Sequence, residues 1–155
     1  MRQSLRSCFA LAAIALPGLL ASQAQAADAT VQAAGVKFEA QTVYIEAGER
    51  VSWEGMNGHN VESLNAMIPE GGTEFNTQVG ENVTLTFEEP GIYVYKCTPH
   101  WGARMGGVIV VGQPENPGQI IDDYLAAIET DRAGLLPAKG LLKDARTSLE
   151  EQGML

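Results

Sequence analysis

Three side chains with metal-binding groups lie in one short segment of the chain. Cys97, His100 and Met105 follow the spacing Cys-x2-His-x4-Met, and the only other histidine, His59, lies far upstream. A thiolate, two imidazoles and a thioether are the donors of an electron-transfer copper site, in which two His and one Cys surround the ion and Met binds at a longer distance. These residues therefore predict a copper ion that cycles between Cu(I) and Cu(II).

Two predicted strands hold this segment at its ends. Gly91–Lys96 is rich in β-branched and aromatic residues, and Gly107–Val111 is a short apolar run; both patterns are typical of strands. Cys97 then ends the first strand, and His100 and Met105 lie on the connection to the second. Such a frame can hold the ligands in a geometry that neither copper oxidation state would adopt alone, so electron transfer needs little rearrangement.

Other chemistries are conceivable for the same residues. A structural zinc site takes Cys or His ligands rather than Met, and a c-type haem requires a second cysteine that Cys97–His100 lacks. A cysteine nucleophile could use His100 as its base, but no nearby residue is recognisable as an orienting group or an oxyanion hole. The remaining alternative is a buried free Cys, a surface His and a core Met with no common function. The presence of Met105 together with both histidines favours copper.

Residues 1–26 have the pattern of an export signal. Arg2 and Arg6 give a positive start, residues 9–16 are apolar, and Ala24–Ala26 matches a small-residue cleavage site. The apolar run is too short to cross a bilayer, and no other segment approaches the required length. We therefore expect a periplasmic protein without membrane insertion that begins after residue 26.

The number of cysteines and the net charge limit the compartments and the classes of partner that suit the protein. Export would leave Cys97 as the only cysteine, and a lone thiol in an oxidising compartment is a liability unless it is buried or bound to metal. Loss of the leader, which holds two arginines and no acid, leaves 8 basic residues against 19 acidic ones, a formal charge of −11. This charge argues against nucleic acid and anionic membranes and favours a basic partner protein, although it also fits a general role in solubility.

Short segments along residues 30–111 predict strands, and apolar and polar residues alternate in 50–54 and 82–87. The predicted strands, with turn residues between them, are 30–33, 42–46, 50–54, 59–64, 82–87, 91–96 and 107–111. Because no helical segment interrupts them, residues 27–112 are expected to form an all-β domain, a Greek-key β-sandwich or else a small barrel. Tyr93 follows a Pro-Gly corner and is expected either to bond back to that corner or to be an ordinary core or edge tyrosine.

Residues 113–155 have a different pattern. A linker with Pro and Gly at 113–118 precedes two segments with helical spacing, 119–131 and 138–152. Their apolar residues share one face of each helix, namely Ile120, Ile121, Tyr124, Leu125 and Ile128 in the first and Leu141, Leu142, Ala145 and Leu149 in the second. We expect two C-terminal α-helices that pack on the sandwich; the other possibility is an arm that binds a partner.

Three stretches resemble the cupredoxins, and among them the pseudoazurins. They are Gly58–Glu62, Met67–Gly71 and the run from Pro90 to Met105, which contains Lys-Cys-Thr-Pro-His-Trp-Gly-Ala-Arg-Met. Plastocyanins share the Cys-x2-His-x4-Met spacing, whereas two helices after the last strand are a pseudoazurin trait. The resemblance is good over residues 43–112, and the helices match in kind more than in sequence.

This resemblance implies a role for each site residue. The implied ligands of one type 1 copper ion are His59, Cys97, His100 and Met105. His100 would be the ligand nearest to solvent, where electrons enter and leave. Gly58 would offer a distant carbonyl, and Asn60 and Thr98 would brace the two ligand segments through hydrogen bonds.

The resemblance also implies a function. Pseudoazurins are periplasmic carriers of single electrons, not enzymes, that deliver electrons to nitrite reductase and have c-type cytochromes as other partners. We expect the same of this chain, as a monomer, because protein would fill all four ligand positions and leave no open site for a substrate. The alternative is copper storage or delivery, although Met56, Met67 and Met154 are more scattered than exchangeable ligands would be. A metal-free module that binds a partner protein is a third possibility.

Two features depart from the family. Pseudoazurins often surround the copper end with lysines that meet an acidic reductase, whereas here only Lys96 and Arg104 lie near the site in a strongly acidic chain. The usual partner is therefore in question. Arg104 also adjoins Met105, and a fixed positive charge close to copper would favour Cu(I) and raise the reduction potential; an Arg104 side chain that points into water would not.

Overall fold

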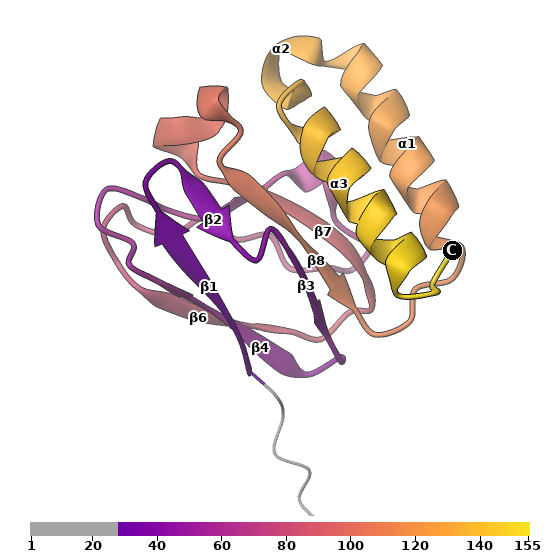
Figure 1. Cartoon of the computed structure of the whole chain (residues 1–155), viewed down its shortest axis with the longest axis horizontal. Coiled ribbons are helices and arrows are strands. Elements are labelled where there is room, and N and C mark those ends of the chain that lie inside the picture. Colours follow the sequence, from indigo (N-terminus) through magenta and orange to yellow (C-terminus); the bar gives the residue numbers. More distant parts are fainter. Residues whose placement is uncertain (1–27) are drawn as a thin grey trace, which may run out of the picture.

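Two four-stranded sheets face each other, and a layer of helices covers one of them (Figure 1). The computed structural model describes residues 28–155; the predicted export signal, residues 1–26, lies outside this part. The first sheet has the order β2-β1-β4-β6 and the second the order β3-β8-β7-β5. The strands are β1 (Asp28–Ala34), β2 (Lys37–Glu39), β3 (Thr42–Ile45), β4 (Glu49–Glu54), β5 (Glu62–Ser63), β6 (Val83–Phe87), β7 (Gly91–Lys96) and β8 (Gly106–Val111).

Both sheets are mixed, because each contains a parallel pair. β1 runs parallel to β4 and β3 runs parallel to β8, while the other pairs are antiparallel. The predicted two-sheet sandwich is confirmed, and the predicted strands are present except in the segment 59–64, where only Glu62–Ser63 is a strand. The sequence does not predict β2, which is too short to show a pattern: only Phe38 in it is buried.

Helices occupy the chain after the last strand, as predicted, so the all-β class holds for the sandwich but not strictly for the whole chain. They are α1 (Pro117–Thr130), α2 (Arg132–Leu135) and α3 (Ala138–Glu151). The two predicted helices are α1 and α3, and the short α2 between them is additional. Asp131 begins α2, because its Oδ1 accepts a hydrogen bond from the Gly134 N–H at 3.2 Å, which satisfies a backbone donor that a helix start leaves free.

Strand β7 separates two buried cores. The inter-sheet core, between the two sheets, contains Val31, Val51, Trp53, Met56, Tyr93, Tyr95, Cys97, Met105 and Ile109 among others. The helix-side core, between the second sheet and the helices, contains Met67, Ile92, Val94, Val108, Val110, Ile121, Ile128, Leu141, Leu142, Ala145 and Leu149 among others. Side chains alternate along a strand, so Tyr93 and Tyr95 point into the first core and Ile92 and Val94 into the second. Cys97 continues this alternation, which places its thiol inside the sandwich.

Hydrogen bonds attach the helices to the second sheet. Tyr44 Oη in β3 donates to Ser148 Oγ in α3 at 2.8 Å, and Tyr124 Oη in α1 donates to the Ile92 carbonyl at 2.9 Å. The helices therefore pack on the sandwich as predicted and do not form a separate arm. Tyr93 Oη donates to the Glu89 carbonyl at 2.9 Å, which confirms that it bonds back to its corner.

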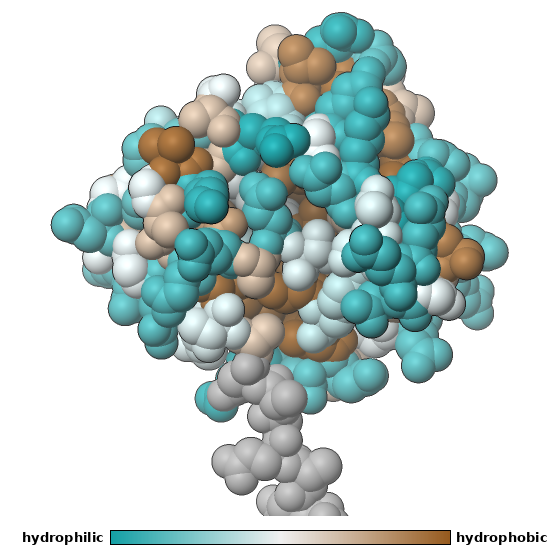
Figure 2. Space-filling model, in the orientation of Figure 1, coloured by the Kyte–Doolittle hydropathy of each residue, from teal (hydrophilic) through white to brown (hydrophobic). Residues whose placement is uncertain are grey.

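The outer surface is largely hydrophilic. Figure 2 shows mostly polar residues over the face that carries β1 and α3, with apolar side chains in several separate places. Within residues 28–155, no helix combines the length and the apolar character that a membrane span requires.

Candidate metal centre

The loop after β7 is folded back on itself by its own backbone. Residues Thr98–Ala103 form two short 3-10 turns, together η2, which follow Cys97 directly and are separated by a kink at His100. The Cys97 N–H donates to the Met105 carbonyl at 2.8 Å, the His100 N–H donates to the Cys97 carbonyl at 3.1 Å, and the Met105 N–H donates to the His100 carbonyl at 3.3 Å. These three bonds hold Cys97, His100 and Met105, the predicted ligands in this loop, close together.

His59 reaches the loop from a separate turn after β4. Its N–H donates to the Met56 carbonyl at 2.8 Å, and its carbonyl accepts from the Gly80 N–H at 2.9 Å. Gly58, with φ of +83°, allows this turn, because a residue with a side chain rarely adopts that conformation. The backbone of two segments far apart in the sequence therefore aims His59 at Cys97.

Three donor atoms from these segments form a small triangle. Cys97 Sγ lies 3.7 Å from His59 Nδ1 and 3.5 Å from His100 Nδ1, and the two Nδ1 atoms are 3.1 Å apart. Within residues 28–155 this is the only group of three or more His, Cys, Asp or Glu side chains close enough to share a metal ion.

The size of the triangle fits a metal ion at its centre. A triangle with these sides has a circumradius of about 2.0 Å, close to the bond lengths of about 2.0 Å for imidazole nitrogen and 2.3 Å for thiolate sulfur in zinc sites. One soft sulfur and two imidazoles in a trigonal arrangement are the donors typical of an electron-transfer copper site. The residues present therefore suit copper.

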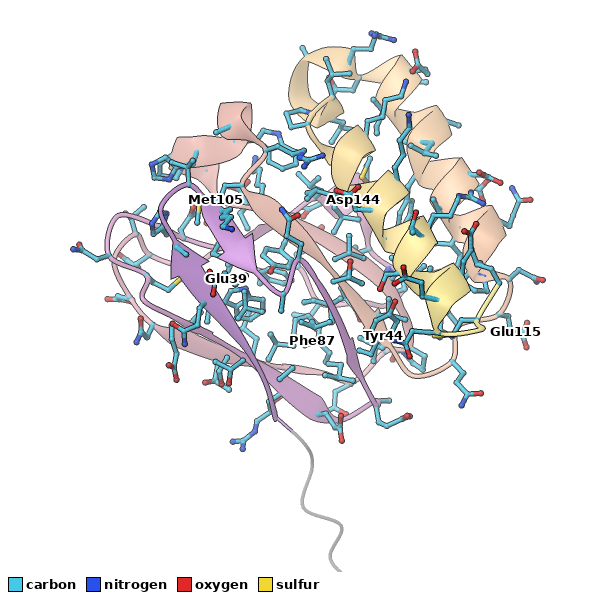
Figure 3. All side chains as sticks on the ribbon, in the orientation of Figure 1. Glu39, Tyr44, Phe87, Met105, Glu115 and Asp144 are labelled. Carbon is cyan, nitrogen blue, oxygen red and sulfur yellow. The ribbon has the colours of Figure 1, made fainter. Side chains whose placement is uncertain are left out.

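Met105 is fully buried in the inter-sheet core next to this triangle. Figure 3 shows it directly below the η2 loop, at the end of the sandwich away from Phe87 and Glu115. Its backbone bonds to Cys97 and His100 place it beside both residues. Its role as the fourth, axial ligand stays a prediction, as does that of the Gly58 carbonyl.

Burial differs among the three triangle residues. Cys97 is buried and has no disulfide partner among residues 28–155, His59 is 8% exposed, and His100 is half-buried. Burial lowers the pKa of His59, and the neighbouring His100 lowers it further, so His59 favours the neutral form that a metal ligand requires. His100 is thus the most accessible of the three, in line with its predicted position nearest to solvent.

Asn60 links the two ligand segments. Its Oδ1 accepts from the Thr98 N–H at 2.8 Å, and its Nδ2 donates to Thr98 Oγ1 at 3.2 Å. A further bond from Nδ2 reaches Asn76 Oδ1 at 3.3 Å. These contacts connect the residue after His59 to the residue after Cys97, as the resemblance implies.

Asn60→Ala is expected to weaken copper binding without removing a ligand. It breaks both bonds between the ligand segments, and loss of residues that orient metal ligands typically costs about 10–100-fold in affinity. Competition with a copper chelator measures this change. Asn57→Ala, an exposed change in the same turn, is the matched control and should leave affinity unchanged; equal affinities for the two variants would contradict the bracing role.

A charged network beside Thr98 is not apparent from the sequence. Thr98 Oγ1 donates to Glu62 Oε2, and Lys96 Nζ lies 3.2 Å from Glu62 Oε1. Partial burial alone would raise the pKa of Glu62, but the hydrogen bond from Thr98 and the hydrogen bond and charge of Lys96 outweigh it and lower this pKa. The pairing of Glu62 with Lys96 in adjacent strands β5 and β7 is a long-range contact, so no local signal reveals it.

The lowered pKa predicts a pH-dependent contribution to stability. A carboxyl with a folded-state pKa below its ordinary value of 4.5 stabilises the fold above that value and loses this effect as the pH falls through the folded-state pKa. In metal-free protein, Glu62→Gln should lower the free energy of unfolding by about 0.5–1 kcal/mol near neutral pH and by nothing in strong acid. Urea unfolding across pH tests this, with exposed Glu81→Gln as control; a difference that persists in acid would refute it.

Arg104 does not simply point into water. Its Nη1 lies 3.5 Å from Asp144 Oδ2 in α3, so its charge is directed to the helical layer and partly balanced there. Lys96 is likewise paired, with Glu62. The two cations that the sequence places near the site are therefore both engaged in ion pairs.

Comparisons with known proteins agree with this geometry. The family described as copper binding proteins, plastocyanin/azurin family, matches residues 25–112. A pseudoazurin from Paracoccus pantotrophus is 38% identical over 109 residues, which covers 69% of this chain and 75% of the relative. The crystal structure of pseudoazurin from Methylobacterium extorquens superimposes with a TM-score of 0.56 at 27% identity, covering 61% of this chain and 82% of that one. Pseudoazurin from Hyphomicrobium denitrificans gives 0.54 at 28% identity, with coverages of 64% and 83%.

Proposed function

Because the chain belongs to the plastocyanin/azurin family of copper-binding proteins and is pseudoazurin-like within it, we propose that it carries single electrons between larger redox proteins in the periplasm. As a member of this group it is a type 1 copper electron carrier, not an enzyme. The compartment and the partners are the proposed part. The same proposal includes three parts of the chain, namely an export signal at 1–26, a copper domain at 27–112 and a helical extension at 113–155.

The observation that carries the proposal is the triangle of Cys97 Sγ and two Nδ1 atoms. We assign His59, Cys97, His100 and Met105 as the residues that would hold copper. When bound, copper supplies one-electron chemistry by alternating between Cu(I) and Cu(II). The protein holds the donors at fixed spacing, so neither state requires the loop to move.

The surrounding residues separate the metal from water except at one side. Cys97 and Met105 are completely buried, and His59 nearly so, while His100 is half-buried. Solvent and a partner protein therefore approach most closely at the His100 ring. This ring is the proposed place of electron entry and exit.

The positions of the methionines support a carrier over a copper storage protein. Met56 belongs to the inter-sheet core and Met67 to the helix-side core, each almost fully buried. Met154 packs against the helix-side core. These side chains fill separate parts of the interior and do not gather into a set of exchangeable soft ligands.

For partners we propose redox proteins such as a nitrite reductase or a c-type cytochrome. The ion pairs of Lys96 with Glu62 and of Arg104 with Asp144 leave these cations less able to meet an acidic partner. With an excess of acidic residues in the whole chain, long-range attraction favours a partner with a basic docking face.

Stopped-flow oxidation and reduction of the copper-loaded protein tests this proposal. The probes are a c-type cytochrome with a basic haem edge and a copper nitrite reductase, each at several ionic strengths. Attraction between opposite charges weakens as salt rises, so the rate with the cytochrome should fall. Rates with both probes that stay slow at every ionic strength would contradict electron transfer to proteins of these classes.

A further inference from the structure

Two side chains of the ligand loop that are not ligands connect it to the helical layer. Trp101 Nε1 donates to the Gly134 carbonyl of α2 at 2.7 Å, and the Trp101 ring packs against the helix-side core. Arg104 pairs with Asp144 of α3. The stretch between His100 and Met105 is therefore attached to the helices at two points.

The Arg104 side chain also lies on the surface of α3 at Gly140. A Cβ at position 140 would overlap with Arg104 Nη1 and lie 2.8 Å from its Cδ. Glycine at this position thus leaves the room that the guanidinium group occupies. This packing is important because the ion pair itself is half-exposed, with 47% of the Arg104 side chain accessible, and exposed pairs contribute little on their own.

The backbone of Arg104 gives an independent reason why the loop needs such support. Its φ of 63° and ψ of 31° are left-handed, a conformation that residues other than Gly, Asn and Asp rarely adopt. Backbone of this kind persists where surrounding contacts hold it in place. Here the Arg104 N–H donates to the Trp101 carbonyl at 2.8 Å, so the two attached residues also support each other.

We propose that Trp101 and Arg104 are positioning residues, through which α2 and α3 fix the loop that carries His100 and Met105. The loop spans both cores, since Cys97 and Met105 belong to the inter-sheet core and Trp101 packs on the helix-side core. A change in the helices that touches no ligand is therefore expected to alter the copper site. The expected effect on copper rests on the proposed ligand assignment, whereas the expected effect on the loop does not.

Gly140→Ala tests the proposal from the helix side. Alanine favours a helix over glycine, so the change displaces Arg104 without weakening α3. Trp101→Phe tests the second attachment, because it removes the indole N–H and keeps an aromatic ring. Lys143→Ala, an exposed change in the same helix, is the control for a substitution in α3 away from Gly140; if Trp101→Phe fails to fold, Gly140→Ala still decides the question.

The first measurement is hydrogen exchange of the Arg104 and Met105 amides in metal-free protein. Each test variant should exchange about fivefold faster than the control, as expected for the loss of one hydrogen bond or an equivalent contact. The second measurement is the reduction potential and the relative intensity of the thiolate-to-copper absorption bands, both of which should shift in the test variants and not in Lys143→Ala.

Each outcome has a defined meaning. Exchange equal to the control in both variants would overturn the proposal, and so would faster exchange with unchanged potential and spectrum. A third outcome is that the variants exchange faster than the control but the unmodified protein takes up no copper. This result would support the attachment of the loop to the helices and contradict the proposed copper function.

Discussion

Cys97→Ser is expected to abolish the intense blue absorption of the copper-loaded protein. The colour of such sites arises from charge transfer from thiolate sulfur to Cu(II), and a hydroxyl cannot supply this soft donor. Cys97 is the only cysteine among the described residues and is fully buried, so no other thiol of residues 28–155 can replace it. Visible absorption after addition of Cu(II) to the metal-free variant measures the effect.

A matched control for this variant is Thr98→Ser, next to the cysteine. Serine keeps the hydroxyl that bonds to Asn60 and Glu62 and leaves the donor triangle untouched, so the colour should persist. Circular dichroism of both metal-free variants establishes that they are folded. Blue colour in folded Cys97→Ser protein would refute the assignment of Cys97.

Met105→Gln is expected to keep copper bound and to lower the reduction potential. An oxygen donor from the glutamine amide is harder than a thioether and favours Cu(II) over Cu(I). A tenfold change in relative affinity for the two states corresponds to about 59 mV for a one-electron couple, and we expect a drop on the order of 100 mV. Protein-film voltammetry gives the potential directly.

The control for this variant is Met67→Leu in the helix-side core. Volume-conserving changes between Met and Leu cost little in stability, and Met67 belongs to the opposite face of β7 from Met105. Its potential should equal that of the unmodified protein. An unchanged potential in Met105→Gln as well would show that Met105 is not the axial ligand.

The sequence predicts those parts of the fold in which apolar residues recur at the regular spacing of a strand or a helix. Alternation of polar and apolar residues along β4 predicts a buried face with Val51 and Trp53, and both lie in the inter-sheet core. Helical spacing predicts the buried face of α3, including Leu142 and Leu149. In both cases, the residues that determine the burial pattern lie within a few positions of one another.

The parts that it does not predict depend on pairing between distant segments. β2 is too short to show a period, and within the predicted strand 59–64 the segment from His59 to Val61 is held by bonds to residues 77–80 and 98 instead of a strand ladder. The hydrogen bonds from Thr98 to Glu62 and from Trp101 to Gly134 join residues more than thirty positions apart. The sequence predicts the metal ligands because only a few residue types have suitable donor atoms. The contacts that support these ligands form only in the complete fold, so the sequence does not predict them.

X-ray absorption at the copper edge tests the central claim most directly. The claim is that His59 and the loop after β7 meet around one ion, with two imidazole nitrogens and one thiolate sulfur at similar short distances. The triangle of 3.1, 3.5 and 3.7 Å predicts one sulfur and two nitrogens at about 2.0–2.3 Å from copper. A first shell of nitrogen and oxygen only, or one with a single nitrogen, would contradict it.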